Sequence, residues 1–258
     1  TSHKNIGKIT RILGFLMGDG CIYATKEKYG RKERIRYRIT FFSKNFNDLE
    51  EIRKEIKDLG FNPSRIYSRK RKIKVENSYG TFYTINNENF FVVNSNTLSL
   101  FFHKLGVEVG EKKYSKYPEW ILKAPKWIKR NFLAGLFGAE LTKPSTIKNH
   151  PYTFSQHFLT IGVKKEFKNY GLKFLKLIKK LLEEFDIKVT KIYEIPGTKN
   201  SVGLRLVISN KDENLINLYS KINYEYNNER RYLANLALYY LKYIKSKYKS
   251  KLKSVRRK

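Results

Sequence analysis

The strongest constraint on this chain is a pair of short apolar segments that repeat one pattern. The first covers residues 12–20 and the second covers residues 133–141. Each has helical hydrophobic spacing and small residues four positions apart, and each contains a single acid near its end, Asp19 or Glu140. Small residues at positions i and i+4 form a groove on one helix face, so two such helices can pack with their backbones close together. The pattern predicts that the two segments pair as helices.

The two acids lie at electrostatically unfavourable places. The C-terminus of a helix carries a partial negative charge, so a carboxylate there is disfavoured unless a cation lies nearby. If the helices pack in parallel, Asp19 and Glu140 approach each other and their repulsion adds to this cost. A divalent cation resolves both problems, because Mg²⁺ prefers carboxylate and phosphate oxygens. The alternative is two ordinary amphipathic helices, each ended by a solvated acid.

The charge balance indicates a polyanionic partner. The 258 residues include 54 Lys and Arg against 23 Asp and Glu, which gives a formal net charge of +31. Such an excess causes self-repulsion in the folded state, and a nucleic-acid partner explains it most simply. The 19 Tyr and 17 Phe exclude a disordered basic tail. A lysine-rich proteome is the alternative, but it would raise Glu together with Lys.

The single cysteine and the absence of targeting signals narrow the class further. Cys21 stands alone, which excludes an internal disulfide framework and a Cys-rich zinc site, and we interpret it as a packed small residue. The sequence shows no signal peptide and no membrane-spanning segment. We therefore expect an intracellular protein.

An internal duplication extends beyond the two segments. β-prone stretches, an amphipathic run (residues 45–59 or 166–185) and further β-prone stretches follow each acid in the same order. Each half is predicted as helix, two strands, helix, two strands, helix, with a tail helix from Glu229 to about Tyr248. Pro118 and Pro125 bracket the junction, so we predict a first repeat at residues 1–124 and a second at residues 125–258.

The two segments resemble the LAGLIDADG motif of homing endonucleases: ILGFLMGDG at residues 12–20 and LAGLFGAEL at residues 133–141. Two copies in one chain point to the monomeric branch, and the chain is also similar to endonuclease domains of archaeal inteins. The resemblance implies an α/β (α+β) fold of two pseudo-symmetric αββαββα repeats. The motif helices would pack at the centre, under an antiparallel β saddle over DNA. A cytoplasmic, archaeal monomer is expected.

The resemblance also implies an activity. We expect a site-specific endonuclease that makes a staggered double-strand cut in a long DNA target by metal-dependent phosphodiester hydrolysis. About two or three Mg²⁺ ions would assist, with Mn²⁺ or Ca²⁺ as substitutes. The expected metal ligands are Asp19, Gly18, Glu140 and Ala139. The catalytic candidates are Asp19 and Glu140 together with Lys113, Lys116 and Arg230, although each of these basic residues could instead be a simple phosphate contact.

Basic residues alternate with apolar ones in several predicted strands. In residues 34–39 three arginines alternate with apolar residues, so the guanidinium groups share one face while the other face packs on helices. Residues 65–69 repeat the alternation, and Lys72 and Lys74 are expected to continue it on the same face. In the second sheet, neutral side chains are expected to read the bases: His150, Thr153, Gln156 and Thr160. A β-ribbon fits the major groove, where Arg and Lys reach guanine O6 and N7. For any single strand, a solvated face is the alternative. The candidate DNA-binding residues are Arg34, Arg36, Arg38, Arg65, Tyr67, Arg69, Lys72, Lys74, Lys143, His150, Thr153, Gln156, Lys188, Lys191, Tyr193, Lys199 and Arg205.

The second motif departs from the family pattern at its end. Glu140 replaces the commoner aspartate, and Leu141 stands where glycine is usual. Nicking of a single strand is therefore one alternative. The others are an RNA maturase that binds intron RNA without cutting it and a DNA-binding regulator. No terminal splicing blocks are found, so we expect a free-standing or excised endonuclease rather than a self-splicing protein.

Overall fold

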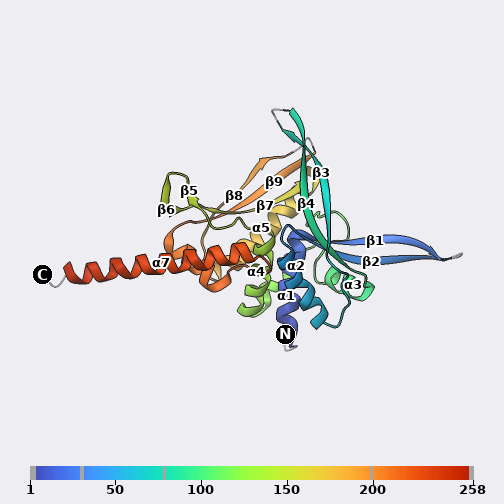
Figure 1. Cartoon of the computed structure of the whole chain (residues 1–258), viewed down its shortest axis with the longest axis horizontal. Helices are drawn as coiled ribbons and strands as arrows, with labels where there is room; N and C mark the ends of the chain where they lie inside the picture. Colours follow the sequence, from blue (N-terminus) through green and yellow to red (C-terminus); the bar gives the residue numbers. More distant parts are fainter. Residues whose placement is uncertain (1–3, 30–31, 78–79, 198–199, 256–258) are drawn as a thin grey trace.

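A computed structural model of the protein describes residues 4–29, 32–77, 80–197 and 200–255 (Figure 1). Two motif helices lie side by side at its centre, α1 (Ile6–Asp19) and α4 (Lys126–Glu140). Strands and further helices of each half surround this pair. The predicted mixed α/β fold with antiparallel sheets and central motif helices is confirmed.

The first half follows the predicted order of elements. After α1 come β1 (Gly20–Tyr29), β2 (Lys32–Ser43), α2 (Phe46–Asp58), β3 (Tyr67–Asn77), β4 (Gly80–Val93) and α3 (Asn96–Lys104). The four strands form one antiparallel sheet in the order β1-β2-β4-β3. The short helix η1 (Glu119–Lys123) then leads to α4, so the boundary that we predict between residues 124 and 125 falls between these two helices.

The second half differs in its first strands. After α4 come β5 (Thr146–Ile147), β6 (His150–Phe154), β7 (His157–Lys164), η2 (Lys165–Phe167), α5 (Lys168–Glu183), β8 (Val189–Pro196), β9 (Ser201–Ile208), α6 (Asp212–Asn217), η3 (Leu218–Ile222) and α7 (Asn228–Val255). In the part of the chain that the structure describes, the sheet has three strands, in the order β7-β9-β8, and β5 and β6 form a separate hairpin. The chain leaving α4 makes a single bridge, Leu141 with Leu159. Pro144, which has no N–H to donate, follows and cannot extend a ladder.

Glycine permits the close approach of α1 and α4. A Cβ atom at Gly14 would lie 2.0 Å from the Phe132 carbonyl oxygen, and one at Gly135 would lie 2.1 Å from the Arg11 carbonyl oxygen. Such distances are far inside van der Waals contact, so a larger residue would force the helices apart. The predicted pairing through small residues is confirmed, and the helices run in parallel with their C-termini together.

Each sheet buries one face against helices. In the first sheet Ile39, Phe41 and Phe91 are fully buried, and the Phe41 and Phe91 rings stack with centroids 5.0 Å apart. In the second sheet Leu159 and Leu206 are fully buried. Burial of each such side chain contributes about 1.5–3 kcal/mol, so these faces fix the sheets on the helices.

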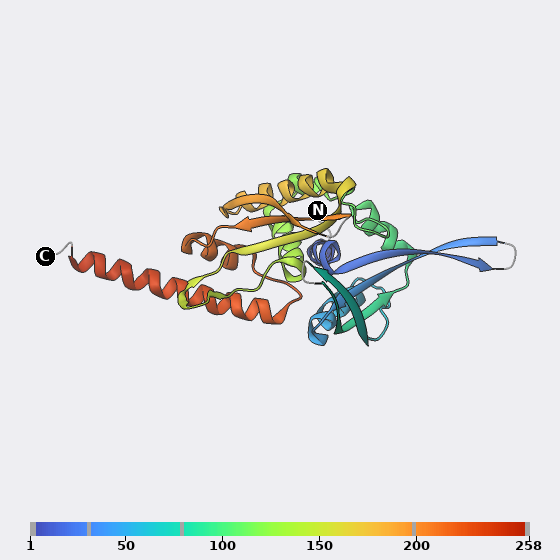
Figure 2. The same cartoon turned by 90° about the horizontal axis from the view of Figure 1, so that it is seen from above.

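The tail helix α7 is longer than predicted. It spans 28 residues and extends away from the rest of the molecule (Figure 2). It begins one residue before the predicted start and continues seven residues past the predicted end at Tyr248. Among the described residues no helix, α7 included, has the length and apolar character needed to cross a membrane.

Candidate functional site

The two motif acids meet at the C-terminal ends of α1 and α4. A Cβ atom at Gly18 would lie only 2.8 Å from Cγ of Glu140, which shows how closely the two helix ends approach. Burial, and then the negative charge of Asp19, raise the pKa of Glu140 to about 7. Desolvation by the surrounding protein also raises the pKa of Asp19, although this side chain opens to solvent. The arrangement therefore disfavours two bare negative charges.

Two cations of the protein itself offset this charge. Lys112 Nζ donates a hydrogen bond to the carbonyl oxygen of Gly18. Arg230 Nη1 donates to the carbonyl oxygens of Phe137, Gly138 and Ala139, at 3.1, 2.7 and 2.9 Å. These carbonyls belong to the last turns of the two helices, where partners and positive charge are both needed. Lys112 and Arg230 each lower the pKa of both acids.

One carboxylate shapes the loop that carries Lys112. Glu108 accepts hydrogen bonds from the backbone N–H groups of Lys113, Tyr114 and Ser115, and from the Ser115 hydroxyl at 2.6 Å. Tyr114 adopts a left-handed backbone conformation, with φ of 58°, and its ring is buried. Burial lowers the pKa of Lys112, which faces the motif acids. The loop thus holds a desolvated lysine against the end of α1.

Lys112 is a residue that the sequence interpretation missed. The structure places Lys113 Nζ 5.1 Å from the centre of the Phe167 ring, and Lys116 Nζ 3.3 Å from His103 Nε2. Among the described residues, neither of these predicted lysines donates a hydrogen bond to the motif helices. Three lysines lie within five residues, and the sequence alone does not show which of them faces the acids, because the turn at Tyr114 decides this. The predicted Arg230, by contrast, lies beside Glu140.

The chemistry of the site suits a hard divalent cation. Asp19 and Glu140 supply two carboxylates at a solvent-facing edge, and water or phosphate oxygens would complete a ligand shell. Among the described residues, no three or more His, Cys, Asp or Glu side chains gather as a metal-binding group, so the side-chain donors are these two. The carbonyl oxygens of Gly18 and Ala139, predicted as further ligands, already accept hydrogen bonds from Lys112 and Arg230.

Asp19 lies at the edge of a groove of about 590 Å³ on the free face of the first sheet. The groove is lined by Tyr23 of β1, Phe42 of β2, Arg69 and Arg71 of β3, Glu88 of β4 and Lys112. Arg69 donates to Glu88 through Nε and Nη2 at 2.8 and 2.6 Å. Its guanidinium carbon lies 5.0 Å from the centre of the Phe90 ring. Aromatic faces therefore hold basic groups toward the open groove.

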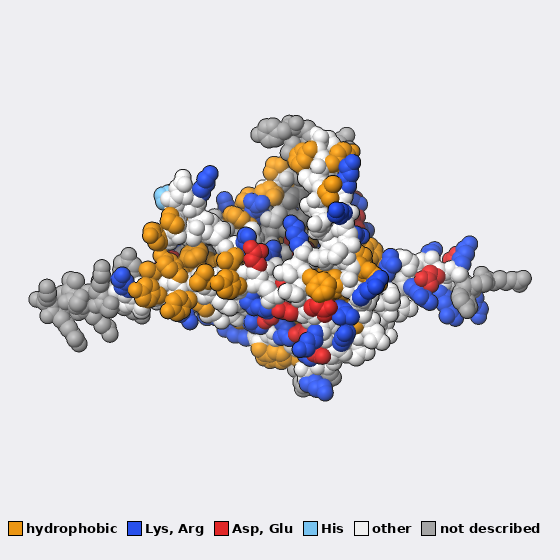
Figure 3. All heavy atoms as spheres, in the orientation of Figure 1, with side chains coloured by type: hydrophobic (Ala, Val, Ile, Leu, Met, Phe, Trp, Pro, Cys, Tyr) orange, Lys and Arg blue, Asp and Glu red, His pale blue; other side chains and the backbone are white. Residues whose placement is uncertain are grey.

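The predicted arginines of β2 lie on this same face. Arg38 pairs with Tyr23 in the ladder, and its guanidinium carbon lies 5.8 Å from the Tyr23 ring centre. Arg36 and Arg34 follow at alternate positions toward the hairpin tip, where Figure 3 shows Lys and Arg side chains gathered. The prediction that the intervening apolar residues pack on helices is wrong at Ile35, which is 50% exposed. The hairpin extends beyond the helices there, and burial begins only at Ile39.

On β3 the register corrects the predicted face. The Arg65 guanidinium lies 5.1 Å from the Tyr67 ring centre, and Tyr67 stacks on Phe90. Lys72 lies three residues beyond Arg69 and pairs with Ile85, so it takes the opposite face of a regular strand. Lys74, whose side chain lies outside the described residues, has the same parity in the ladder. Arg71, which the prediction omitted, occupies the Arg69 face instead.

In the second sheet three of the predicted residues share one face. Tyr193 of β8 and Thr160 of β7 both pair with Arg205 of β9, whose Nε donates to Thr160 Oγ1 at 3.0 Å. Lys191 Nζ lies 4.6 Å from the Tyr193 ring centre. Lys188 is exposed just before β8, and Lys199 lies outside the described residues.

The remaining predicted DNA-binding residues lie off the second sheet. His150 and Thr153 belong to β6, which pairs only with β5, and Gln156 lies between β6 and β7. The prediction that they belong to the second sheet is wrong, because the chain after Leu141 bends away at Pro144 rather than pairing along β7. Lys143 forms an ion pair with Glu229 at 2.6 Å.

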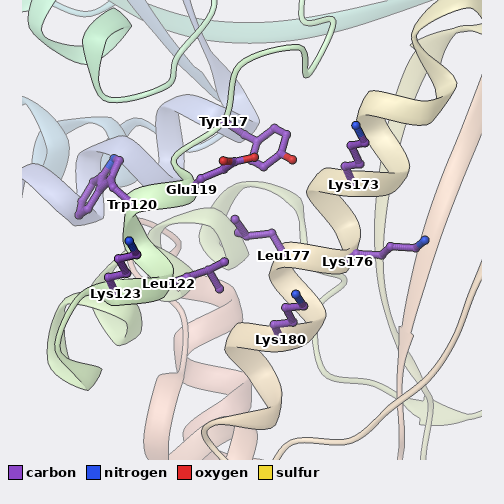
Figure 4. Close-up of a pocket in the computed structure, with 9 residues that line it drawn as sticks. All are labelled: Tyr117, Glu119, Trp120, Leu122, Lys123, Lys173, Lys176, Leu177 and Lys180. Carbon is purple, nitrogen blue, oxygen red and sulfur yellow. The ribbon is translucent and has the colours of Figure 1, made fainter.

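A second hollow, of about 650 Å³, lies away from the acids between η1 and α5 (Figure 4). Trp120, Leu122 and Leu177 provide apolar walls, and Lys173, Lys176 and Lys180 extend from successive turns of α5. α5 packs against the β7-β9-β8 sheet, on the face that holds the core. Positive charge alone therefore does not mark the site, because this basic surface lacks the paired acids.

No family model matches the chain, but curated relatives do. A relative named tRNA-splicing ligase RtcB, from Methanocaldococcus jannaschii, is 43% identical over 243 residues, which are 93% of this chain and 24% of that protein. Relatives of the same name from Methanopyrus kandleri and Pyrococcus furiosus are each 33% identical. The chain therefore spans about a quarter of the length of these relatives.

Relatives with other names match over the same extent. The replication factor C small subunit of Methanocaldococcus jannaschii is 34% identical over 95% of this chain and 12% of that protein. The DNA-directed RNA polymerase subunit Rpo1N of the same organism is 29% identical over 95% of this chain and 18% of that protein.

Solved structures resemble the chain more distantly. Full-length DUF199/WhiA from Thermatoga maritima has a TM-score of 0.48 at 14% identity, covering 99% of this chain and 69% of that one. The I-LtrWI LAGLIDADG homing endonuclease bound to target DNA has a TM-score of 0.48 at 11% identity, covering 95% of this chain and 92% of that one.

The relatives correct the predicted activity. The prediction of a site-specific endonuclease that makes a staggered double-strand cut in DNA is contradicted, because the relatives at 33–43% identity are named tRNA-splicing ligases and not DNA endonucleases. The alternatives of an RNA maturase, a nickase or a DNA-binding regulator do not occur among these names either.

Proposed function

We propose that this chain is a self-contained nucleic-acid-binding domain, inserted in a longer protein of the kind named tRNA-splicing ligase RtcB. It would bind double-stranded DNA across its sheets, as a monomer, with a divalent cation at Asp19 and Glu140. One observation carries the binding proposal: the groove on the first sheet combines basic groups held on aromatic rings with the carboxylate of Asp19 at its edge. This combination suits phosphate oxygens bridged by a hard cation.

The insertion part of the proposal comes from the pattern of relatives. The same stretch, matched over 243 to 258 residues, recurs in proteins named as a ligase, a replication factor subunit and a polymerase subunit. It occupies no more than about a quarter of each of these three proteins. A shared segment in proteins of different name is best explained as a separate unit with its own fold, such as the domains carried within inteins. We also propose an archaeal source and a cytoplasmic location.

The residues at this site have two different roles. Asp19 and Glu140 would ligate the cation, and Mg²⁺ is the ion that we propose, with Mn²⁺ or Ca²⁺ as substitutes. Lys112 and Arg230 favour the ionised carboxylates, because each lowers the pKa of both acids. They also keep the two helix ends in place through the carbonyl oxygens that they bind.

Binding of a labelled DNA duplex tests the proposal. Fluorescence anisotropy of a random-sequence duplex should show tighter binding in Ca²⁺ than in EDTA, and binding should weaken steeply with salt. In the variants Asp19→Asn and Glu140→Gln the gain from Ca²⁺ should disappear while basal binding remains. Lys176→Glu on α5 provides the control, because it lowers the charge away from the groove and should leave the Ca²⁺ gain intact. A flat salt response, or a Ca²⁺ gain that survives both acid variants, would contradict the proposal.

The relatives' names favour a second candidate, that the segment binds RNA for a tRNA-splicing reaction. The 43% identity to a tRNA-splicing ligase is the observation in its favour. A duplex RNA of the same sequence, titrated in parallel, separates the two candidates. Preference for the RNA would support the second candidate, and preference for the DNA would support the first.

Deletion tests the insertion itself. Removing the matching 243-residue segment from the Methanocaldococcus jannaschii relative should leave its ligase activity intact if the segment is a separate unit. Loss of ligation in a deletion protein that still folds would contradict the insertion proposal without affecting the binding proposal.

A further inference from the structure

The outer face of α7 carries a stripe of exposed apolar side chains. The stripe consists of Tyr232, Leu236, Tyr239 and Tyr243, which are 68%, 55%, 74% and 55% exposed. Their spacings of four, three and four residues are those of the a and d positions in a heptad. Side chains at these positions normally pack into holes on a facing helix. The stripe therefore has the form of one half of a helix pair.

An apolar groove of about 470 Å³ adjoins the stripe. It lies between α7 and the β5–β6 hairpin, and its walls include Pro144, Pro151, Phe154, Leu233 and Tyr240. The hairpin adds exposed Tyr152 and Ile147. Figure 3 shows hydrophobic side chains gathered over this part of the molecule, on the left of the view. Exposed apolar side chains that gather around a groove mark an interaction site more often than apolar side chains that are scattered singly.

The charges around the stripe define the chemistry of its partner. α7 contains one acid, Glu229, among eight Lys and Arg, and Glu229 is already paired with Lys143. When Leu236 and Tyr243 occupy a positions, Lys242 and Lys247 take the flanking g and e positions, which form ion pairs across helix pairs. A second copy of this chain would bring equal positive charge against these lysines. An acidic partner complements them.

We propose that the stripe on α7 and the adjoining groove dock an acidic amphipathic helix of a partner protein. Apolar residues of that helix, at heptad spacing, would pack against Leu236 and Tyr239, and its Glu side chains would lie beside Lys242. This surface shares no residue with the groove at Asp19, so the proposal stands independently of the nucleic-acid function.

A synthetic peptide serves as the probe. We would label a helical peptide that has Leu at its a and d positions and Glu at the flanking positions, and titrate it with the full chain. Two control peptides accompany it: one with Lys in place of every Glu, and one with the acidic sequence scrambled. The acidic heptad peptide should bind saturably, and about tenfold more tightly than either control.

Variants locate the binding surface. The double variant Leu236→Glu and Tyr239→Glu changes two exposed side chains and should weaken peptide binding about tenfold. Lys242→Glu changes no residue of the stripe and should weaken binding of the acidic peptide while strengthening binding of the lysine peptide. Leu100→Glu, at an exposed apolar position on α3, is the matched control and should bind like the original chain.

Four outcomes would overturn the proposal. Acidic-peptide binding that survives both α7 variants, or a scrambled peptide that binds equally well, would show that net charge alone attracts the peptide. Sedimentation that shows a dimer, lost in the double variant, would make a second copy the occupant. If a DNA duplex displaces the peptide from the unmutated chain, the surface would be assigned to nucleic acid. Far-UV circular dichroism verifies that each variant is folded.

Discussion

The two halves of this molecule end their motif helices alike but build different sheets around them. In each half, a basic residue from the segment after the third helix binds the last carbonyl groups of the motif helix: Lys112 at α1 and Arg230 at α4. The first half then forms a four-stranded sheet, whereas the second forms three strands and a separate hairpin. The helix ends are alike because both need positive charge, while the sheet edges are free to vary.

The divergence begins at the last residue of each motif. At Gly20 a Cβ atom would lie 2.5 Å from Leu16 Cδ1, so glycine lets β1 start there and pair with Phe41 without a shift of the Leu16 side chain. At the equivalent position Leu141 is fully buried and forms only a bridge to Leu159. The residue at this position therefore belongs to the core in the second half, whereas in the first half it begins a strand.

The largest effect is expected where the halves are most alike. Gly14→Ala and Gly135→Ala each push a Cβ atom into a backbone carbonyl of the facing helix, so each should destabilise the fold by about 3 kcal/mol. Gly162→Ala, where a Cβ atom meets nothing within 4 Å, is the matched control and should change stability by less than about 0.5 kcal/mol. Urea unfolding measures all three. Clearly unequal costs at the two crossing glycines would break the equivalence of the halves.

The two cations should differ in strength. Arg230→Met removes three hydrogen bonds to carbonyl groups of α4 and should cost about 2 kcal/mol, whereas Lys112→Met removes one hydrogen bond and should cost about 1 kcal/mol. Lys112 should also contribute less to the free energy of unfolding, because burial disfavours its charged form. Urea unfolding at neutral pH checks the order. An equal or reversed order would show that the number of capped carbonyls does not set the effect.

Glu140 should make stability depend on pH. Its pKa is raised from the ordinary 4.5 to about 7 in the folded protein, so the folded state binds the proton more tightly. The stabilisation is therefore present below about pH 4.5 and is lost as the pH rises through 7. The expected fall is at least about 1 kcal/mol, and Glu140→Gln should remove it.

Controls define the source of this pH dependence. The exposed Glu33→Gln variant should keep the fall in stability. Addition of Ca²⁺ should flatten it in the original chain, because a bound cation favours the ionised carboxylate. An unchanged slope in Glu140→Gln would assign the pH dependence to another group.

The sequence predicted much of the fold because helix pairing and strand alternation are local patterns. Glycine spacing indicated the contact between α1 and α4, and the duplication indicated the order of the elements in both halves. The loss of a fourth strand from the second sheet was not predicted, although Leu141 and Pro144 are both visible in the sequence. Strand pairing depends on where the chain turns after α4, which no single residue reveals.

The site was predicted less completely than the fold. Asp19, Glu140 and Arg230 do meet, since the motif fixes two of them and the duplication indicated the third. Lys112 was missed because the hydrogen bonds of Glu108 and the turn at Tyr114 select one lysine out of three. Lys72 was predicted on the wrong face. It lies an odd number of residues from Arg69, so the alternation of side chains along a strand already puts it on the opposite face. The activity was predicted wrongly, because a motif indicates a scaffold more directly than the reaction performed on it.

The smallest effects should come from the sheet faces. Arg38 lies at the open surface of the first sheet, whereas Arg205 is half-buried and bound to Thr160. Arg38→Glu should therefore weaken binding of a DNA duplex about tenfold and reduce its salt dependence, while Arg205→Glu should weaken it about threefold. Anisotropy titrations at several salt concentrations measure both, with Lys176→Glu on α5 as the charge-matched control. Equal losses at Arg38 and Arg205 would mean that both sheets contribute alike despite their different edges. A loss at Lys176 as large as that at Arg38 would mean that net charge, and not the face of the first sheet, attracts the duplex.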